Sequence, residues 1–386
     1  MLISFSVKNH KGCSDINTDT LMVSPKSNDL ITIDVPMQKF SLLKSAFIIG
    51  MNGVGKTSYL DALWFMTKAA NGEWYVGDRE TYDYALPGQT LDKDKVSTYK
   101  IRITKDKFYS LEYGFSISGG FDVTIEREWL TLLTSKGEVP IFDRIRKDTP
   151  EIQIIVCGRG KYNKKTKMWE IFTPAYTYHV NPKMCMSIVN TLIEETSPRI
   201  LLITRVYRNV KEAKIKVPSY SCIKAVGDFF ENKILFLQNV RECCIWRRIT
   251  EKPYTVETAK ELLSALDVKC ADYYFDLTVK HEGSKVPPAV EKLIDLCLLM
   301  TYAGEYDILL VADDLCDGLD DIVVEKYLDL FHNALSTDSQ LLASSRNLSL
   351  ISDCVLDYQM YLLTEKGNSY KVSESLGEAL ELLAGE

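Results

Sequence analysis

The chain has 386 residues, 46% of them hydrophobic and 26% charged, which is enough apolar content for the core of one large domain or two ordinary ones. Its 46 basic and 53 acidic residues give a formal net charge of −7, so the chain as a whole offers no attraction to nucleic-acid phosphates or anionic lipids. Ten scattered cysteines without a CxxC pair, together with only four histidines, argue against a zinc site.

The first strand is expected over residues 2–7, where apolar and polar side chains alternate. This stretch has no basic leader followed by an apolar run, and no window approaches 18 uninterrupted apolar residues. We therefore expect a cytoplasmic protein with reduced thiols and no membrane association. The apolar run 46–49 predicts a second strand that leads into a glycine-rich turn. Residues 57–70 carry bulky side chains at spacings of three and four, which is typical of a helix with one packed face.

The pattern of apolar and polar residues changes twice after this helix. Residues 97–130 alternate apolar and polar side chains around short polar turns, which predicts antiparallel strands. Residues 180–270 show helical periodicity, basic clusters and no strong strand, and we interpret them as a helical insertion. The helix expected after Pro288 has the apolar spacing of a core helix. From Leu309 onward strand and helix alternate again, so the two αβ segments are predicted to form one sheet.

The glycine-rich turn fits the phosphate-loop pattern GxxxxGK[ST] and lies between an apolar strand and a helix, as that pattern requires. Its glycines let backbone N–H groups curl around a phosphate, Lys56 supplies a positive charge, and the hydroxyl of Thr57 is expected to hold Mg²⁺. The alternative is a tight glycine turn with a chance lysine. The predicted nucleotide-binding residues are Gly50, Asn52, Gly53, Val54, Gly55, Lys56, Thr57 and Ser58.

An apolar strand closed by two acids, Ile308 to Asp314, supplies a second part of the predicted site. A nucleotide-bound Mg²⁺ also needs a carboxylate at a strand end, so Asp313 is the predicted metal ligand beside Thr57. Taken alone, a strand of this kind often just ends in a solvated loop. Because the chain also carries the phosphate loop, we favour the functional interpretation.

Several stretches resemble the ABC-type AAA ATPases of abortive-infection and other phage-defence systems, which are relatives of OLD, RecF and SMC heads. The opening LISFSVKN and the loop GMNGVGKT carry the first part of the resemblance. Asp313 to Asp320 parallels the Walker B and D-loop stretch of ABC proteins. Residues 340–351, QLLASSRNLSLI, stand where the family has a strand ending in Thr-His, and residues 361–367 look like the family's final strand and turn.

The resemblance implies an α/β fold, an ABC-ATPase-type P-loop NTPase head with an antiparallel β subdomain and a helical insertion. We place the N-terminal part of the head with Walker A at 1–175, the insertion at 176–275, and the C-terminal part with Walker B and the D-loop at 276–386. The family binds ATP with Mg²⁺ between facing heads, which implies a homo- or hetero-oligomer.

Three positions depart from the family pattern. Asp314 stands where the family has a glutamate that polarises the attacking water, and its shorter side chain is expected to slow hydrolysis. Arg346 stands at the switch histidine, where it could contact phosphate but could not accept a proton. The signature segment falls on Pro287 to Val290, which lacks serine, glycine and the N–H groups that prolines do not have. An alternative placement at Glu282 to Ser284 keeps one glycine but lengthens the interval to the acids.

These departures predict a nucleotide-holding protein with weak turnover, acting as a nucleotide-dependent sensor or scaffold for a partner effector protein in phage defence. One alternative is an active ATPase motor of the DNA-repair or SMC type, although long heptads are not seen. Another is an ATPase subunit working with a nuclease on a separate chain, because the stretch after Asp320 is too short for a fused nuclease domain. A binding-only module is the remaining option.

The other polar features favour ordinary structural roles. The basic stretches 161–167 and 205–216 could hold nucleic acid, but a solvated surface is the preferred interpretation because the chain is acidic overall. Gln89 is a candidate for the magnesium-sensing glutamine of ABC proteins, with nothing around it to fix that role. Arg241 and Trp246 could form a partner surface or belong to the core. His281 and His332 have no sequence neighbours that suggest a triad or a metal site, and Cys316 is expected to be a small hydrophobic side chain.

Overall fold

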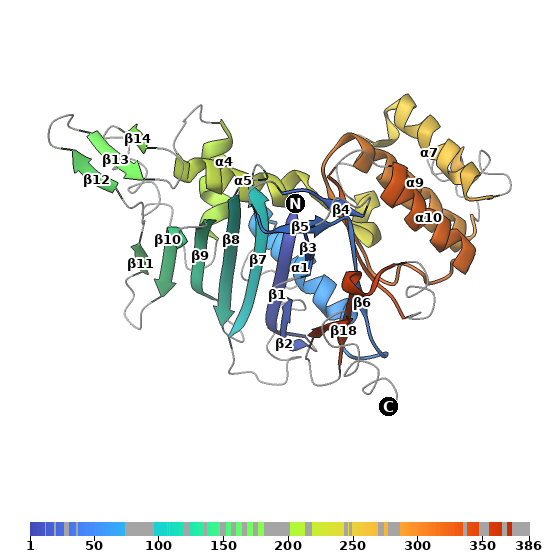
Figure 1. The fold of residues 1–386 in the computed structure, drawn as a ribbon, viewed down its shortest axis with the longest axis horizontal. Coiled ribbons are helices and arrows are strands. Elements are labelled where there is room, and N and C mark those ends of the chain that lie inside the picture. Colours follow the sequence, from blue (N-terminus) through green and yellow to red (C-terminus); the bar gives the residue numbers. More distant parts are fainter. Residues whose placement is uncertain are drawn as a thin grey trace.

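The computed structural model of the chain contains several sheets and flanking helices (Figure 1). It describes residues 1–11, 13–18, 21–26, 31–35, 38–73, 96–105, 107, 109–118, 124–134, 137–146, 152–155, 160–163, 168–172, 177–180, 201–212, 218–242, 246, 249–268, 274–276, 286–334, 338–346, 355–364 and 369–372. Within this part of the chain, no helix is both long enough and apolar enough to span a lipid bilayer.

The central sheet joins strands from three distant parts of the chain. Its order is β15 (Ile234–Phe236), β16 (Leu309–Ala312), β17 (Gln340–Ser344), β6 (Ser45–Ile49), β18 (Met360–Leu363) and β19 (Ser369–Lys371). All neighbouring pairs are parallel except β18 and β19. The prediction that the two αβ segments form one sheet is confirmed, and β17 separates the strand of the phosphate loop from the strand of the two acids.

A second, seven-stranded sheet is antiparallel throughout. Its order is β11 (Ile152–Ile155), β10 (Gly137–Arg146), β9 (Thr124–Thr134), β8 (Tyr109–Ser118), β7 (Ser97–Lys105), β1 (Leu2–His10) and β2 (Cys13–Thr18). The antiparallel strands expected over residues 97–130 are therefore confirmed. The described residues also form two small three-stranded sheets. One consists of β3 (Val23–Pro25), β5 (Phe40–Leu43) and β4 (Thr32–Ile33), and the other of β12 (Gly160–Asn163), β13 (Met168–Phe172) and β14 (Thr177–Val180).

The central strands bury both of their faces, because alternate side chains enter different hydrophobic cores. Ala46 and Ile48 of β6 face a core shared with helix α1 (Lys56–Asn71) and the antiparallel sheet. Phe47 and Ile49 face the opposite core, which contains α7 (Pro253–Ala265), α9 (Pro288–Glu305) and α10 (Asp321–Ala334). Figure 1 shows these three helices together at one side of the molecule. The helix that follows the phosphate loop is thus held between two sheets.

The segment expected to be a helical insertion contributes more than helices. It contains α4 (Leu202–Glu212), α5 (Pro218–Asn232) and α7, but also β15 at the edge of the central sheet and the short 3₁₀ helix η1 (Leu237–Glu242). The sequence showed no strong strand in this segment, and β15 has only three residues, which are too few to show alternation in sequence. The proposed boundaries of the insertion stay a prediction.

A buried carboxylate joins α4 to the antiparallel sheet. Glu128 of β9 accepts hydrogen bonds from the backbone N–H groups of Leu202 and Ile203, at 2.6 and 2.9 Å, and so caps the N-terminus of α4. Arg144 of β10 lies 3.6 Å from the same carboxylate, and both side chains are almost completely buried. Burial raises the pKa of Glu128, while Arg144 opposes that shift.

Candidate functional site

The loop between β6 and α1 has the backbone conformation of a phosphate-binding turn. Gly50, Gly53 and Gly55 have positive φ angles of 145°, 88° and 103°, which L-amino acids with side chains rarely adopt. A Cβ atom at Gly50 would lie 2.5 Å from the carbonyl oxygen of Leu363 in β18, so a side chain there would displace backbone. The glycines are therefore required by geometry as well as by the sequence pattern.

The first turn of α1 opens towards this loop. Gly55 is the N-cap residue, no side chain of the described residues caps the helix there, and no acidic residue lies in the first turn. An uncapped helix N-terminus directs backbone N–H groups and a partial positive charge at whatever lies before it. This arrangement suits an anion such as a phosphate group.

Lys56 lies over the loop from the helix side. Its side chain is largely buried, and its ammonium group donates hydrogen bonds to the carbonyl oxygens of Gly50 and Met51, at 2.5 and 2.8 Å. The pKa of Lys56 is lowered, and burial is the largest cause. The negative charge of Asp314 opposes this shift, and the positive charge of Arg346 adds to it. The lysine is therefore within electrostatic reach of the charged groups that follow β16 and β17.

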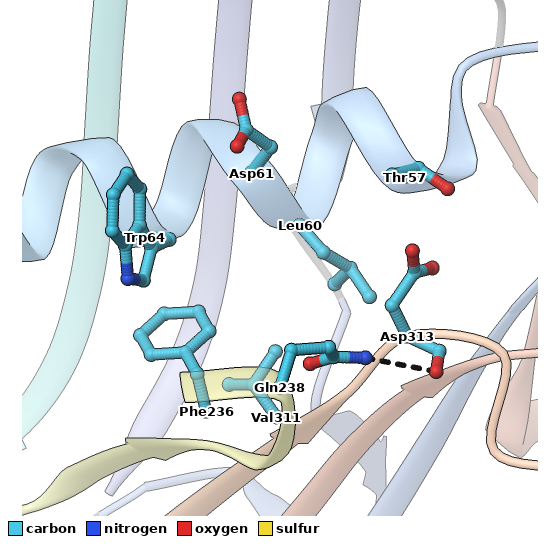
Figure 2. Close-up of a pocket in the computed structure, with 8 residues that line it drawn as sticks. All are labelled: Thr57, Leu60, Asp61, Trp64, Phe236, Gln238, Val311 and Asp313. Carbon is cyan, nitrogen blue, oxygen red and sulfur yellow. Dashed lines mark hydrogen bonds between the residues drawn. The ribbon is translucent and has the colours of Figure 1, made fainter. Parts of the chain in front are cut away.

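Asp313 directly follows β16 and faces the first turn of α1. One of its carboxylate oxygens, Oδ1, accepts a 2.5 Å hydrogen bond from the hydroxyl of Ser344 at the end of β17. Its backbone carbonyl accepts a 2.9 Å hydrogen bond from the side-chain amide of Gln238 in η1. Asp313, Gln238 and Thr57 line one cavity of about 140 Å³, and Figure 2 shows Asp313 near Thr57 at one end of it.

The other end of this cavity is aromatic. Trp64 of α1 and Phe236 of β15 lie there, with Leu60 and Val311 between them and the polar end. Asp61 also lines the cavity, and its carboxylate is bound by His10, at 3.0 Å, and by Lys11, at 2.6 Å. The remaining lining residues are those already named at the polar end: Thr57, Gln238 and Asp313. The cavity thus runs along α1 from Thr57 towards Trp64.

Asp314 is held in place by all three of its polar groups. Its N–H donates to the hydroxyl of Ser344 at 2.8 Å, and its carbonyl accepts from the ammonium group of Lys292 at 2.8 Å. Its carboxylate accepts from the guanidinium of Arg346 at 2.5 Å. The residue has a φ angle of 47°, in the left-handed region that aspartate tolerates better than most residues. Arg346 remains 59% exposed, so its side chain can reorganise at small cost.

The structure brings most of the predicted site residues together. They lie at the carboxyl ends of three neighbouring strands of the central sheet. The loop 50–57 and Ser58 follow β6, the two acids follow β16, and Arg346 follows β17. Within the loop Asn52 and Gly53 are exposed and Val54 is buried. We conclude that the strand order places the phosphate loop and the acids opposite one another.

The predicted signature segment lies at the N-terminus of α9. Pro287 is the N-cap residue of that helix and Pro288 its first residue, and both are exposed. Neither has an N–H group, so the first turn of α9 has fewer free donors than an ordinary helix N-terminus. The alternative placement, 282–284, lies outside the described residues, as do Gln89 and His281.

The other expectations concern residues away from the loop. The basic stretches 161–167 and 205–216 are only partly within the described residues. Trp246 is buried in the core, and the guanidinium of Arg241 lies 5.6 Å from its ring centre. The Arg241 side chain is partly exposed and pairs with Glu291 and Asp295. His332 is buried, and its Nε2 lies 2.7 Å from the hydroxyl of Ser45.

Gln238 and Ser344 are site residues that the sequence reasoning missed. Gln238 directly follows the apolar run 234–237, and Ser344 directly follows the apolar run 341–343. A polar residue at the end of an apolar run was therefore the available signal for both, as it was for Asp313. Gln238 lines the cavity together with Asp313.

The sequence matches no family model and no characterised protein sequence. Among solved structures, the chain is similar to the SMC head domain from Thermotoga maritima, with 13% identity, a TM-score of 0.39, and coverage of 95% of this chain and 97% of that chain. An SMC head bound to the C-terminal winged-helix domain of ScpA gives 11% identity, a TM-score of 0.39, and coverage of 97% and 99%. The ADP conformation of an ATP-binding cassette of an ABC transporter gives 16% identity, a TM-score of 0.25, and coverage of 35% and 52%.

Proposed function

We propose that this chain is an ATP-binding head of the ABC type, in which the loop 50–57 holds the phosphates and Thr57 and Asp313 hold the cation. The observation that carries the proposal is the convergence of two independent elements on one cavity. A glycine loop with positive φ angles opens α1, and the acid that closes β16 lines the same cavity as Thr57.

The donor set at this edge of the sheet fits Mg²⁺. Magnesium is usually bound through one or two carboxylates together with phosphate oxygens and water, rather than by an all-protein cage. Thr57 offers a hydroxyl and Asp313 a carboxylate whose second oxygen remains for a ligand. When bound, the cation would neutralise phosphate charge. Gln238 is hydrogen-bonded to the carbonyl of Asp313, so we propose that its position depends on whether the cation is bound.

Weak hydrolysis is part of the proposal. The acid next to Asp313, where a glutamate would orient the attacking water, is Asp314, and its carboxylate is bound by the guanidinium of Arg346. Its side chain is also one methylene shorter than that of a glutamate, so it is expected to reach such a water less well. Arg346 is proposed to contact the terminal phosphate once nucleotide is bound, since its guanidinium suits phosphate geometry.

The proposal includes a biological setting. We place the chain in an antiviral defence system, as a homo- or hetero-oligomeric head that changes shape with nucleotide state and holds an effector protein. The proline-rich start of α9 supports a heteromeric arrangement, because it lacks N–H groups that a partner's nucleotide would require. An active ATPase motor, or an ATPase subunit with a separate nuclease chain, is the competing function.

ATP affinity and ATP turnover, measured on the same preparation, test this function. We expect ATP to bind and turnover to stay far below one per second. Lys56→Ala should abolish binding, because it removes the charge that faces the phosphates. Lys68→Ala is the matched control, since Lys68 lies in the last turn of the same helix and pairs with Glu73. Absence of ATP binding would refute the site, and turnover near one per second would favour the motor.

A further inference from the structure

The hydroxyl of Ser344 is shared by the two acids of the proposed site. It donates to Oδ1 of Asp313 at 2.5 Å and accepts from the N–H of Asp314 at 2.8 Å. Ser344 is completely buried at the end of β17, between β16 and β6. The backbone N–H of Asp314 can only donate and the ionised carboxylate of Asp313 can only accept, so these two groups fix the directions of the two bonds.

The first of these bonds controls how Asp313 presents its carboxylate. The hydrogen bond from Ser344 to Oδ1 restricts the rotation of the carboxylate, and among the described residues no hydrogen-bond donor contacts Oδ2, the oxygen that we assign to a ligand in the cavity. A hydrogen bond from a neutral donor to a carboxylate is stronger than one between neutral groups. Partners of this kind orient metal-ligating groups, and their loss typically lowers metal affinity by about 10- to 100-fold.

The second bond controls the backbone after Asp313. The N–H of Asp314 is directed at Ser344 while the residue adopts a φ angle of 47°, and this turn directs the Asp314 side chain to Arg346. The backbone N–H of Leu315 also donates to the carbonyl of Ser344, at 3.0 Å. The end of β17 therefore fixes three consecutive residues of the neighbouring loop.

From this geometry we infer that Ser344 is a positioning residue for the cation of the nucleotide: it sets which oxygen of Asp313 is presented and holds Asp314 beside it. The inference rests on the proposed function, because it concerns the same site. Ser344 touches neither nucleotide nor cation and acts through Asp313.

The test is to vary the Mg²⁺ concentration and to measure ATP binding at each concentration, either by calorimetry or from the ATP-dependent rise in melting temperature. Ser344→Ala should raise the Mg²⁺ concentration for half-maximal effect by about 10- to 100-fold. Ser344→Cys should behave similarly, because a thiol fills the space but is a weak donor. Ser339→Ala is the matched control: this buried serine precedes the same strand and donates to the carbonyls of Ala303 and Tyr306 at its opposite end.

A double-variant comparison separates positioning from a general loss of structure. In an Asp313→Asn background the metal-dependent step is already impaired, so adding Ser344→Ala should leave the Mg²⁺ dependence unchanged. A folded Ser344→Cys variant with the wild-type Mg²⁺ midpoint would overturn the inference while leaving the proposed function intact. Wild-type protein that binds no ATP at any Mg²⁺ concentration would instead refute the proposed function, and this inference with it.

Discussion

Two glycines of the phosphate loop allow a matched comparison of backbone strain with steric exclusion. Alanine at either Gly50 or Gly53 must adopt a positive φ angle, which costs about 1–3 kcal/mol. At Gly53 nothing lies within 4 Å of the added Cβ, so strain is the whole cost. At Gly50 the Cβ also meets the Leu363 carbonyl at 2.5 Å, and overpacking of this kind adds about 1–3 kcal/mol.

We therefore expect Gly50→Ala to lower the free energy of unfolding by about 2–6 kcal/mol, and Gly53→Ala by about 1–3 kcal/mol. Urea unfolding of the two variants measures the difference. ATP binding should be lost in Gly50→Ala, because the loop and the neighbouring strand β18 must move apart, and only weakened in Gly53→Ala. Equal destabilisation by the two substitutions would refute the steric argument and leave strain as the single cause.

Two further predictions follow from charged groups. Arg346→Ala should change the free energy of unfolding by less than about 1 kcal/mol, because the ion pair with Asp314 is exposed on the arginine side. The same substitution should lower the preference for ATP over ADP by about tenfold, which competition binding measures. An unchanged ATP/ADP ratio would exclude contact with the terminal phosphate. Burial is the main reason that the pKa of His332 is lowered from 6.5 to about 4. Between these two pH values the unfolded state binds a proton that the folded state does not, so the free energy of unfolding should fall by about 3 kcal/mol as the pH drops from about 6.5 to about 4. Urea unfolding at pH 7 and pH 4 measures this, and His332→Gln should flatten the dependence; an equal slope in both proteins would contradict it.

The parts of the fold and site that the sequence predicted are those with local signals. The phosphate loop is contiguous, so its glycines, Lys56 and Thr57 could be recognised without knowing the fold. Asp313 was predicted as a metal ligand because an apolar strand ends at it, and that role stays a prediction. The antiparallel strands over residues 97–130 alternate clearly enough to be predicted, whereas their pairing with β1 from the N-terminus depends on distant contacts.

The parts that were missed depend on strand order. Gln238 reaches Asp313 across 75 positions of sequence, and it does so only because β15 pairs with β16. Ser344 reaches Asp313 across 31 positions because β17 lies next to β16 on the other side. Neither strand order nor the three-residue length of β15 leaves a periodic signal in the sequence. Gln89, proposed from sequence, lies outside the described residues.

The position of β17 has a consequence for how nucleotide state would be transmitted. This strand is hydrogen-bonded to β6, which carries the phosphate loop, and to β16, which carries the acids. Beyond its end, the N–H of Ser345 donates to the carbonyl of Ile48 at 3.0 Å, while Ser344 holds Asp313 and Arg346 holds Asp314. Under the proposed function, a phosphate that draws Arg346 away from Asp314 would therefore act on a segment that is bonded to both halves of the site. Because this segment is buried up to Ser345 and exposed at Arg346, a change there would alter the surface without opening the core.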